Sequence, residues 1–456
     1  MSAVTSPEAG LRNVLRFTWP TVASCLCSSA FRINDQFWVG ALGEQAQAAL
    51  GAATFVMILN FALYFLAVAG CMSRIARATG AQDKTARNRA IHHGFALSGL
   101  LALLVGSVGY AFTPELTGLM GLSEGVAAEA VAYIRGTYLM ALPIAFAPLL
   151  DNVFISMGDT RSPLILQILA IALNFVLNPL FIYGGLPSLQ ETPQVWMGVE
   201  GAAFATGLSR AIVVVLGLTW LVRKKGIPLI PESPIALRQL WLIVRTGTPS
   251  CVSIAIYAGV YLALARWVFS EFPDSALAGF SVGFNAFEAV SYPLFLGIAL
   301  GGSAMVGRAL GARDKQLALD LVGTTRRLAL GAGVLISLAF VLIGPHLVQA
   351  FTSEPAVIRE AVLYLRILAV SQIFVALETV SENVHMAAGH TRPIFWISVP
   401  GNLARVPLGI LFALTWGYGP AGLWWAINAT TLVKALLFHT LVLRQNWLRD
   451  PHLGSA

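Results

Sequence analysis

The sequence predicts an all-α integral membrane protein of about twelve transmembrane helices, in two pseudo-symmetric six-helix lobes. Its 456 residues are 57% hydrophobic and only 11% charged, whereas a soluble domain carries about 25% charged residues because its surface faces water. Apolar runs of about 20 residues, the length that crosses a bilayer, recur along the chain. Landmarks of the first half also return in the second half, which indicates two related lobes.

The apolar runs give the membrane spans in chain order. The first run contains Arg32 and Asp35 and lacks a small-residue cleavage site, so it predicts a retained helix rather than a signal peptide. The runs do not alternate with polar residues, which excludes a β-barrel. The expected spans are 13–38, 48–73, 89–112, 130–155, 163–184, 196–222, 240–268, 276–304, 322–343, 360–386, 393–416 and 418–443.

The two halves repeat each other at a constant spacing. Residues 77–84, Arg-Ala-Thr-Gly-Ala-Gln-Asp-Lys, match residues 308–315, Arg-Ala-Leu-Gly-Ala-Arg-Asp-Lys, at an offset of 231. Tyr133-Ile134-Arg135 and Gly158-Asp159-Thr160-Arg161 return at the same offset of 231. Halves of six helices have the same orientation, and parallel repeats of this kind pack around an axis along the membrane normal with a cavity between them.

The repeat also sets the domain boundaries. Gly198 and Gly201 return at an offset of 221, because the first half has about ten extra residues around 186–195. Three prolines mark a segment between the halves that reads as a linker. The expected domains are an N-lobe over 1–222, a cytoplasmic linker over 223–239 and a C-lobe over 240–456.

Basic residues concentrate in one set of loops. Most of the 29 Lys and Arg residues lie in segments such as 74–89, 223–245 and 308–327, while acidic residues dominate the alternate loops. Because Lys and Arg favour the cytoplasmic side, both termini are expected in the cytoplasm of a cell inner membrane. This topology accounts for the net charge of +7 without nucleic acid as a partner.

Enzyme and metal signatures are missing from the sequence. We find no Gly-rich phosphate loop, no nucleophile elbow and no histidine pair spaced for a metal. His92 and His93 are adjacent, and adjacent side chains point about 100° apart on a helix, so a structural role is favoured. The four cysteines lie in apolar runs and are interpreted as core residues. We therefore expect no enzyme activity, no cofactor and no bound metal.

Ionisable and amide side chains inside the expected spans are costly, so they mark candidate sites. Asp35 is the sharpest, and Arg32 is near enough on the helix to share its face. Two readings stay open, a structural Arg32–Asp35 pair or a carboxylate that binds and releases a cation. Asn174 and Asn178 lie one turn apart in the fifth helix and, taken alone, are expected to hold neighbouring helices together. Thr206 lies in the sixth helix and, taken alone, is expected to be a core hydroxyl with its hydrogen bonds satisfied.

Other acids lie in or near the later helices. Asp151 and Glu382 are repeat equivalents near the cytoplasmic ends of the fourth and tenth helices, where structural pairing is favoured. Glu378 belongs to a group of charges for which mutual pairing and function are equal alternatives. The other members of this group are Glu288, Arg405 and Lys434.

Taken in order, these landmarks resemble the multidrug and toxic compound extrusion (MATE) family over nearly the whole chain. They are Asn34-Asp35-Gln36-Phe37-Trp38-Val39-Gly40, the two Gly-Ala-x-Asp repeats, Gly158-Asp159-Thr160, Asn174-x-x-x-Asn178-Pro179 and Gly198-x-x-Gly201-Ala-Ala-x-Ala-Thr206. The resemblance implies twelve helices in two lobes, and export of bulky, often cationic or amphipathic compounds against H⁺ or Na⁺.

Within the family, the landmarks resemble the branch that couples through its N-lobe. That resemblance implies coupling residues Asp35, Asn174, Asn178 and Thr206, although the branch often has Asp where this chain has Asn178. It also implies a bend of the first helix at Pro20. The other branch uses a Glu in helix 7 and an Asp in helix 10. Those positions align with Tyr257, which fails the match, and lie close to Glu378.

We therefore expect a monomeric secondary active multidrug efflux transporter that exchanges small organic compounds for H⁺ by alternating access. H⁺ is favoured over Na⁺ as coupling ion, because Asp35 with neutral neighbours gives one titratable group rather than several charged oxygens. A Na⁺ at Asp35 is the alternative. The rival functions are a lipid-linked precursor flippase of the same superfamily and, from another class, a membrane-embedded lipid-modifying enzyme.

Overall fold

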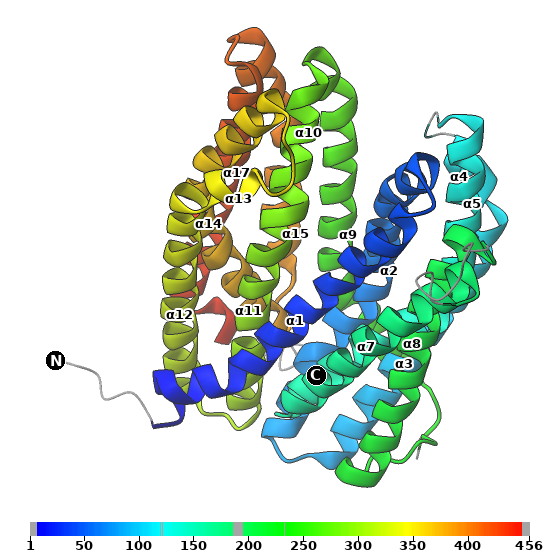
Figure 1. The fold of residues 1–456 in the computed structure, drawn as a ribbon. Helices are drawn as coiled ribbons and strands as arrows, with labels where there is room; N and C mark the ends of the chain where they lie inside the picture. The colour runs from blue at the N-terminus through cyan, green and yellow to red at the C-terminus, as the bar shows by residue number, and fades with distance from the viewer. Residues whose placement is uncertain (1–6, 119, 121, 186–194, 232, 449–456) are drawn as a thin grey trace. The chain divides into compact units, whose positions relative to one another are not determined.

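The computed structural model describes residues 7–118, 120, 122–185, 195–231 and 233–448, and their regular elements are all helical (Figure 1). The ten extra residues assigned to the first half lie almost wholly outside this part. The main helices are α1 (Leu11–Gly40), α2 (Glu44–Gly80), α3 (Lys84–Ala111), α4 (Thr113–Gly118), α5 (Glu124–Leu139), α6 (Ala141–Ser156), α7 (Arg161–Tyr183), α8 (Gly198–Lys225), α9 (Leu237–Trp267), α10 (Asp274–Val282), the π-helix η4 (Gly283–Glu288), α11 (Ala289–Gly311), α12 (Lys315–Leu342), α13 (Gly344–Val348), α14 (Pro355–Ala387), α15 (Arg392–Leu403), α16 (Arg405–Gly409), the π-helix η5 (Ile410–Thr415) and α17 (Gly419–Leu443).

The helices confirm the predicted fold class of a multi-pass membrane protein. Among the described residues, ten helices are long and apolar enough to cross a bilayer. The consecutive helices α5 and α6 bend by 59° at their junction and make an eleventh span when taken together. Helix α1 occupies the predicted span 13–38 but is not among these ten, and it carries the charged residues Arg32 and Asp35.

The repeat seen in the sequence returns in the backbone. Helices α3 and α12 both have 28 residues and are capped by Asp83 and Asp314, each of which accepts a hydrogen bond from a backbone N–H at 2.9 Å. The residue before each cap is in the left-handed region, Gln82 with a φ of 58° and Arg313 with a φ of 61°. An Asp N-cap satisfies a backbone donor that the first helical turn leaves unpaired. The sequence repeat is therefore matched by equal caps and equal turns at the starts of these two helices.

Packing divides the chain into two compact units, each described by itself. Unit 1 comprises Met1–Leu26, Thr79–Gln82 and Val252–Ala456, and unit 2 comprises Cys27–Ala78 and Asp83–Cys251. Helix α1 thus begins in unit 1 and ends in unit 2. These units group residues by packing, whereas the lobes over 1–222 and 240–456 are defined by the repeat. The lobe boundaries stay a prediction.

In unit 1, small residues let α11 approach the first turns of α1. A Cβ atom on Gly297 would lie 2.4 Å from Val22 Cα, and Thr21 Oγ1 donates a hydrogen bond of 2.6 Å to the Gly297 carbonyl. A Cβ on Gly301 would lie 2.9 Å from Thr18 Cγ2. Close backbone approach at small residues is how membrane helices associate. The segment of α1 around Pro20 is therefore packed tightly against α11.

In unit 2, the two adjacent histidines bind the linker. His92 Nε2 donates to the Pro228 carbonyl at 2.7 Å. His93 Nε2 accepts from the Ala236 N–H at 3.0 Å, so its Nδ1 carries the proton donated to the Arg89 carbonyl at 2.8 Å. These bonds give both rings separate structural partners. Within the part of the chain that the structure describes, no group of three His, Cys, Asp or Glu side chains could hold a metal ion.

Candidate functional site

Asp35 lies in unit 2 against two helices that run side by side, α7 and α8 (Figure 1). The residue is only 5% exposed. It accepts hydrogen bonds from Asn178 Nδ2 at 2.8 Å, Thr206 Oγ1 at 3.0 Å and, more weakly, Asn174 Nδ2 at 3.4 Å. The structure thus brings together the four residues predicted as the coupling site, which we call the Asp35 cluster. They come from three helices, so the cluster ties the end of α1 to α7 and α8.

The amide of Asn174 is the centre of a second layer of bonds. Its Nδ2 donates to Thr206 Oγ1 at 2.9 Å, and its Oδ1 accepts from Asn34 Nδ2 at 2.7 Å. Trp38 Nε1 in turn donates to Asn34 Oδ1 at 3.1 Å. Asn34 precedes Asp35 directly but was not among the predicted site residues. Adjacent residues diverge on a helix, and only the position of Asn174 between them brings both into one network.

The arginine that interacts electrostatically with Asp35 is not the predicted one. The Arg32 side chain is exposed, and no ion pair joins it to Asp35 in the described structure. Instead the half-buried Arg210 interacts electrostatically with both Asp35 and Asp151. Its guanidinium lies 4.6 Å from the centre of the Phe31 ring, in a cation–π contact. Arg210 follows Thr206 by one turn of α8, and this helical spacing is the signal that could have selected it.

Asp151 has its own partners in unit 2. Its Oδ2 accepts a hydrogen bond of 2.7 Å from Gln167 Nε2, which joins α6 to α7. Asp151, Gln167 and Arg210 line one small pocket together with apolar side chains such as Leu150 and Val213. Arg210 thus interacts electrostatically with Asp151 in this pocket and with Asp35 of the cluster.

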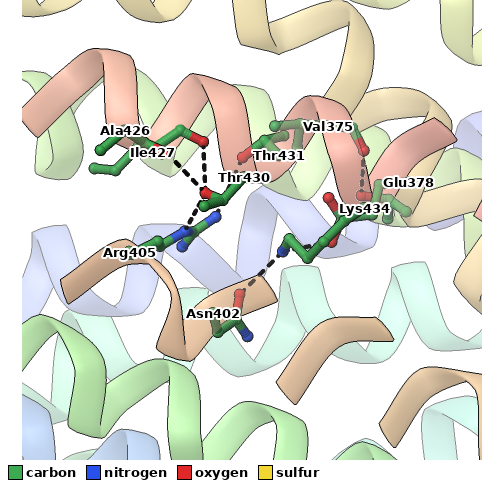
Figure 2. A network of polar contacts seen from close by, with 10 residues as sticks. Val375, Glu378, Asn402, Arg405, Ala426, Ile427, Thr430, Thr431 and Lys434 are labelled. Carbon is green, nitrogen blue, oxygen red and sulfur yellow. Dashed lines mark hydrogen bonds and ion pairs between the residues drawn. The ribbon is translucent and has the colours of Figure 1, made fainter. Parts of the chain in front are cut away.

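The candidate acids of the second half lie in unit 1. Glu378 of α14 forms a salt bridge with Lys434 of α17, with 2.8 Å between Oε1 and Nζ (Figure 2). Glu382 lies one turn further along α14 and interacts electrostatically with both. Tyr257, where the resemblance fails, lies beneath the buried guanidinium of Arg405 at 5.5 Å from the ring centre. The mutual pairing expected as one alternative is therefore present for Glu378 and Lys434.

A glycine sets how closely α7 and α8 approach beneath the Asp35 cluster. A Cβ on Gly201 would lie 2.5 Å from the Phe181 carbonyl oxygen, so Gly201→Ala must push the two helices apart. Overpacking of this kind costs about 1–3 kcal/mol, and we expect the purified variant to unfold at lower temperature and to lose transport. Gly331→Ala is the matched control, because no atom lies within 4 Å of its added Cβ. Equal stability of the two variants would contradict the packing role of Gly201.

Known proteins resemble this chain over nearly its full length. The probable multidrug resistance protein NorM of Thermotoga maritima is 25% identical over 453 residues, covering 96% of this chain and 93% of that protein. The multidrug resistance protein PmpM of Pseudomonas aeruginosa is 23% identical, covering 91% and 88%. A solved outward-facing multidrug resistance transporter of the MATE family superposes with a TM-score of 0.86 at 23% identity, covering 98% of this chain and 99% of that one. The likeness to this solved structure establishes the fold.

The family model named MatE matches residues 20–180 and 249–411. The two matched segments fall one in each half of the sequence repeat. They include Asp35, Asn174 and Asn178 in the first segment and Glu378 in the second. The chain therefore belongs to the MatE family, the multidrug and toxic compound extrusion family that its landmarks resemble.

Proposed function

We propose that this protein is a secondary active multidrug exporter that exchanges small organic compounds, often cationic or amphipathic, for a coupling cation by alternating access. Relatives covering most of the chain are named multidrug resistance proteins, which supports the substrate class. We place the protein in the inner membrane with both termini cytoplasmic, from the distribution of its basic loops. We further assign it to the N-lobe-coupled branch, with Asp35 as the residue that binds the cation.

The observation that carries this proposal is the environment of the Asp35 carboxylate. It is buried, and its hydrogen-bond donors among the described residues are all neutral, two amides and one hydroxyl. An ionisable side chain within a membrane protein is costly and usually functional. Because the cluster itself offers one negative charge, it fits the binding of a single proton better than the binding of Na⁺. We therefore propose H⁺ as the coupling ion.

Asn178 helps to explain how the cluster accommodates both charge states. Its Nδ2 donates to Asp35, while its Oδ1 is buried and has no hydrogen-bond partner among the described residues. An amide can turn and offer either a donor or an acceptor, whereas an ionised Asp at this position could only accept. A protonated Asp35 could then donate to Asn178 Oδ1. Asparagine at 178 thus suits a carboxylate that gains and loses a proton.

The hydrogen bonds of Asp35 suggest how protonation would reach the substrate. Charge-assisted bonds to an ionised carboxylate are stronger than neutral ones, so protonation would weaken the hold of α7 and α8 on α1. The Pro20 ring removes one backbone hydrogen bond and crowds the preceding turn of α1, which favours a bend there. We propose that α1 then shifts and expels the bound compound to the outside.

Transport in proteoliposomes tests this function. Purified protein should accumulate or expel a fluorescent organic cation against its gradient when a pH gradient is imposed. An imposed Na⁺ gradient at equal pH on both sides should give no uphill transport. Uphill transport driven only by Na⁺ would contradict the assignment of H⁺, and no transport under either gradient would contradict the exporter function.

A further inference from the structure

Unit 1 holds a side-chain ammonium in an oxygen-lined site within the membrane-spanning helices. Lys434 is 5% exposed, and its Nζ lies 2.8 Å from Glu378 Oε1 and 3.0 Å from Asn402 Oδ1 (Figure 2). The three residues come from α17, α14 and α15. Carboxylate and amide oxygens are also the ligands that hard inorganic cations take in proteins. The ammonium therefore lies where such a cation would find its ligands.

The route of the Lys434 side chain to this site depends on a glycine. A Cβ atom on Gly401 would lie 2.5 Å from Lys434 Cγ and 2.6 Å from Cδ. Those atoms are the middle of the side chain, which cannot move aside without moving the ammonium. Gly401 thus leaves the space through which the Lys434 side chain reaches Glu378 and Asn402.

Lys434 is the cation that pairs directly with an acidic residue of this site. Glu378 and Glu382 lie one turn apart on α14, and Tyr292 of α11 interacts electrostatically with both. Arg405, the other buried cation nearby, is directed to Thr430 and Thr431 by hydrogen bonds of 3.3 and 3.2 Å (Figure 2). It also lies over the Tyr257 ring and interacts electrostatically with Glu378. Only the Lys434 ammonium forms a salt bridge with Glu378 in the described structure. Removing one partner of such a pair leaves an uncompensated buried charge.

We propose that Lys434 is a fixed cation of this site. Its ammonium holds the place that Na⁺ or K⁺ would otherwise take, so the site neither binds nor releases an inorganic cation. Asp35 is then left as the carboxylate that exchanges the coupling ion, a consequence that rests on the proposed function. The converse also follows. A neutral residue at 434 should turn Glu378 and Asn402 into a site for an alkali cation.

Cation-dependent stability of the purified full chain tests the proposal without any transport measurement. Thermal unfolding is followed at pH 8.5 in NaCl, KCl or choline chloride at equal ionic strength. The wild type should unfold at the same temperature in all three salts. In choline chloride, Lys434→Met should unfold at a lower temperature than the wild type. In NaCl or KCl its unfolding temperature should rise by about 3 °C or more, because a ligand that binds the folded state stabilises it.

Three further variants sharpen the result. Lys434→Arg keeps a cation and should show no salt preference, and Glu378→Gln combined with Lys434→Met should lose the preference that Lys434→Met gains. Gly401→Ala should gain it, because the added Cβ displaces the Lys434 side chain. The proposal is overturned if the wild type is stabilised by Na⁺ or K⁺ in a Glu378-dependent way. It is equally overturned if neither folded Lys434→Met nor folded Gly401→Ala responds to either cation. Since the readout is stability, both results are independent of whether Asp35 couples transport.

Discussion

Asp35→Asn is expected to reduce proton-driven export to background while the protein still inserts and folds. An amide has the shape of the carboxylate and can retain partners in the buried cluster, but it cannot gain or lose a proton. The measurement is uphill transport of a fluorescent cation in proteoliposomes under an imposed pH gradient, with thermal unfolding as the check on folding. Uphill transport by this variant at the wild-type rate would refute the assignment of Asp35.

The neighbours of Asp35 provide graded controls. Asn174→Ala and Thr206→Ala each remove a neutral partner, and interhelical hydrogen bonds of this kind contribute about 1 kcal/mol or less. Both variants should therefore still transport, at a lower rate than the wild type. Drug binding gives an independent measurement, because proton and cationic substrate are proposed to compete and such coupling is reciprocal. Binding to the wild type should tighten as pH rises and Asp35 loses its proton, whereas binding to Asp35→Asn should not follow pH.

Arg210→Met is expected to slow transport strongly and to destabilise the protein most at high pH. Arg210 interacts electrostatically with the buried Asp35 and the half-buried Asp151, so its removal leaves both carboxylates without this compensating charge. We expect a loss of about 1–3 kcal/mol, below the cost of breaking a fully buried pair because the guanidinium is half-buried. Protonation removes the uncompensated charges, so the loss should be larger at pH 9 than at pH 5. Thermal unfolding across this pH range measures it.

Arg32→Met is the matched control for this prediction. Arg32 lies three residues before Asp35 but is exposed, and a surface substitution usually changes stability by less than about 0.5 kcal/mol. Arg210→Lys, which keeps the charge, should retain most of the stability. If Arg32→Met impaired transport and Arg210→Met did not, the charge partner of Asp35 would have been wrongly assigned.

The sequence alone determined the helices and their repetition. A helix or, over 130–155, a bent pair of helices lies at each predicted span, and the Asp83 and Asp314 caps follow directly from the repeated Gly-Ala-x-Asp motif. The sequence also selected Asp35 as the sharpest candidate site residue within the expected spans. The resemblance to a known family then indicated Asn174, Asn178 and Thr206 as its companions, and the structure brings all four together.

Only the tertiary structure decided which charges meet. Helical spacing allowed Arg32 to pair with Asp35, but the packed helix directs Arg32 outward, and Arg210 approaches from α8 instead. Glu378 and Lys434 are 56 residues apart, and their contact depends on how α14 packs against α17. Periodicity along one helix determines which side chains share a face. Which side chains that face meets is decided by how neighbouring helices pack. Glycines such as Gly201 and Gly401 leave the space for that packing.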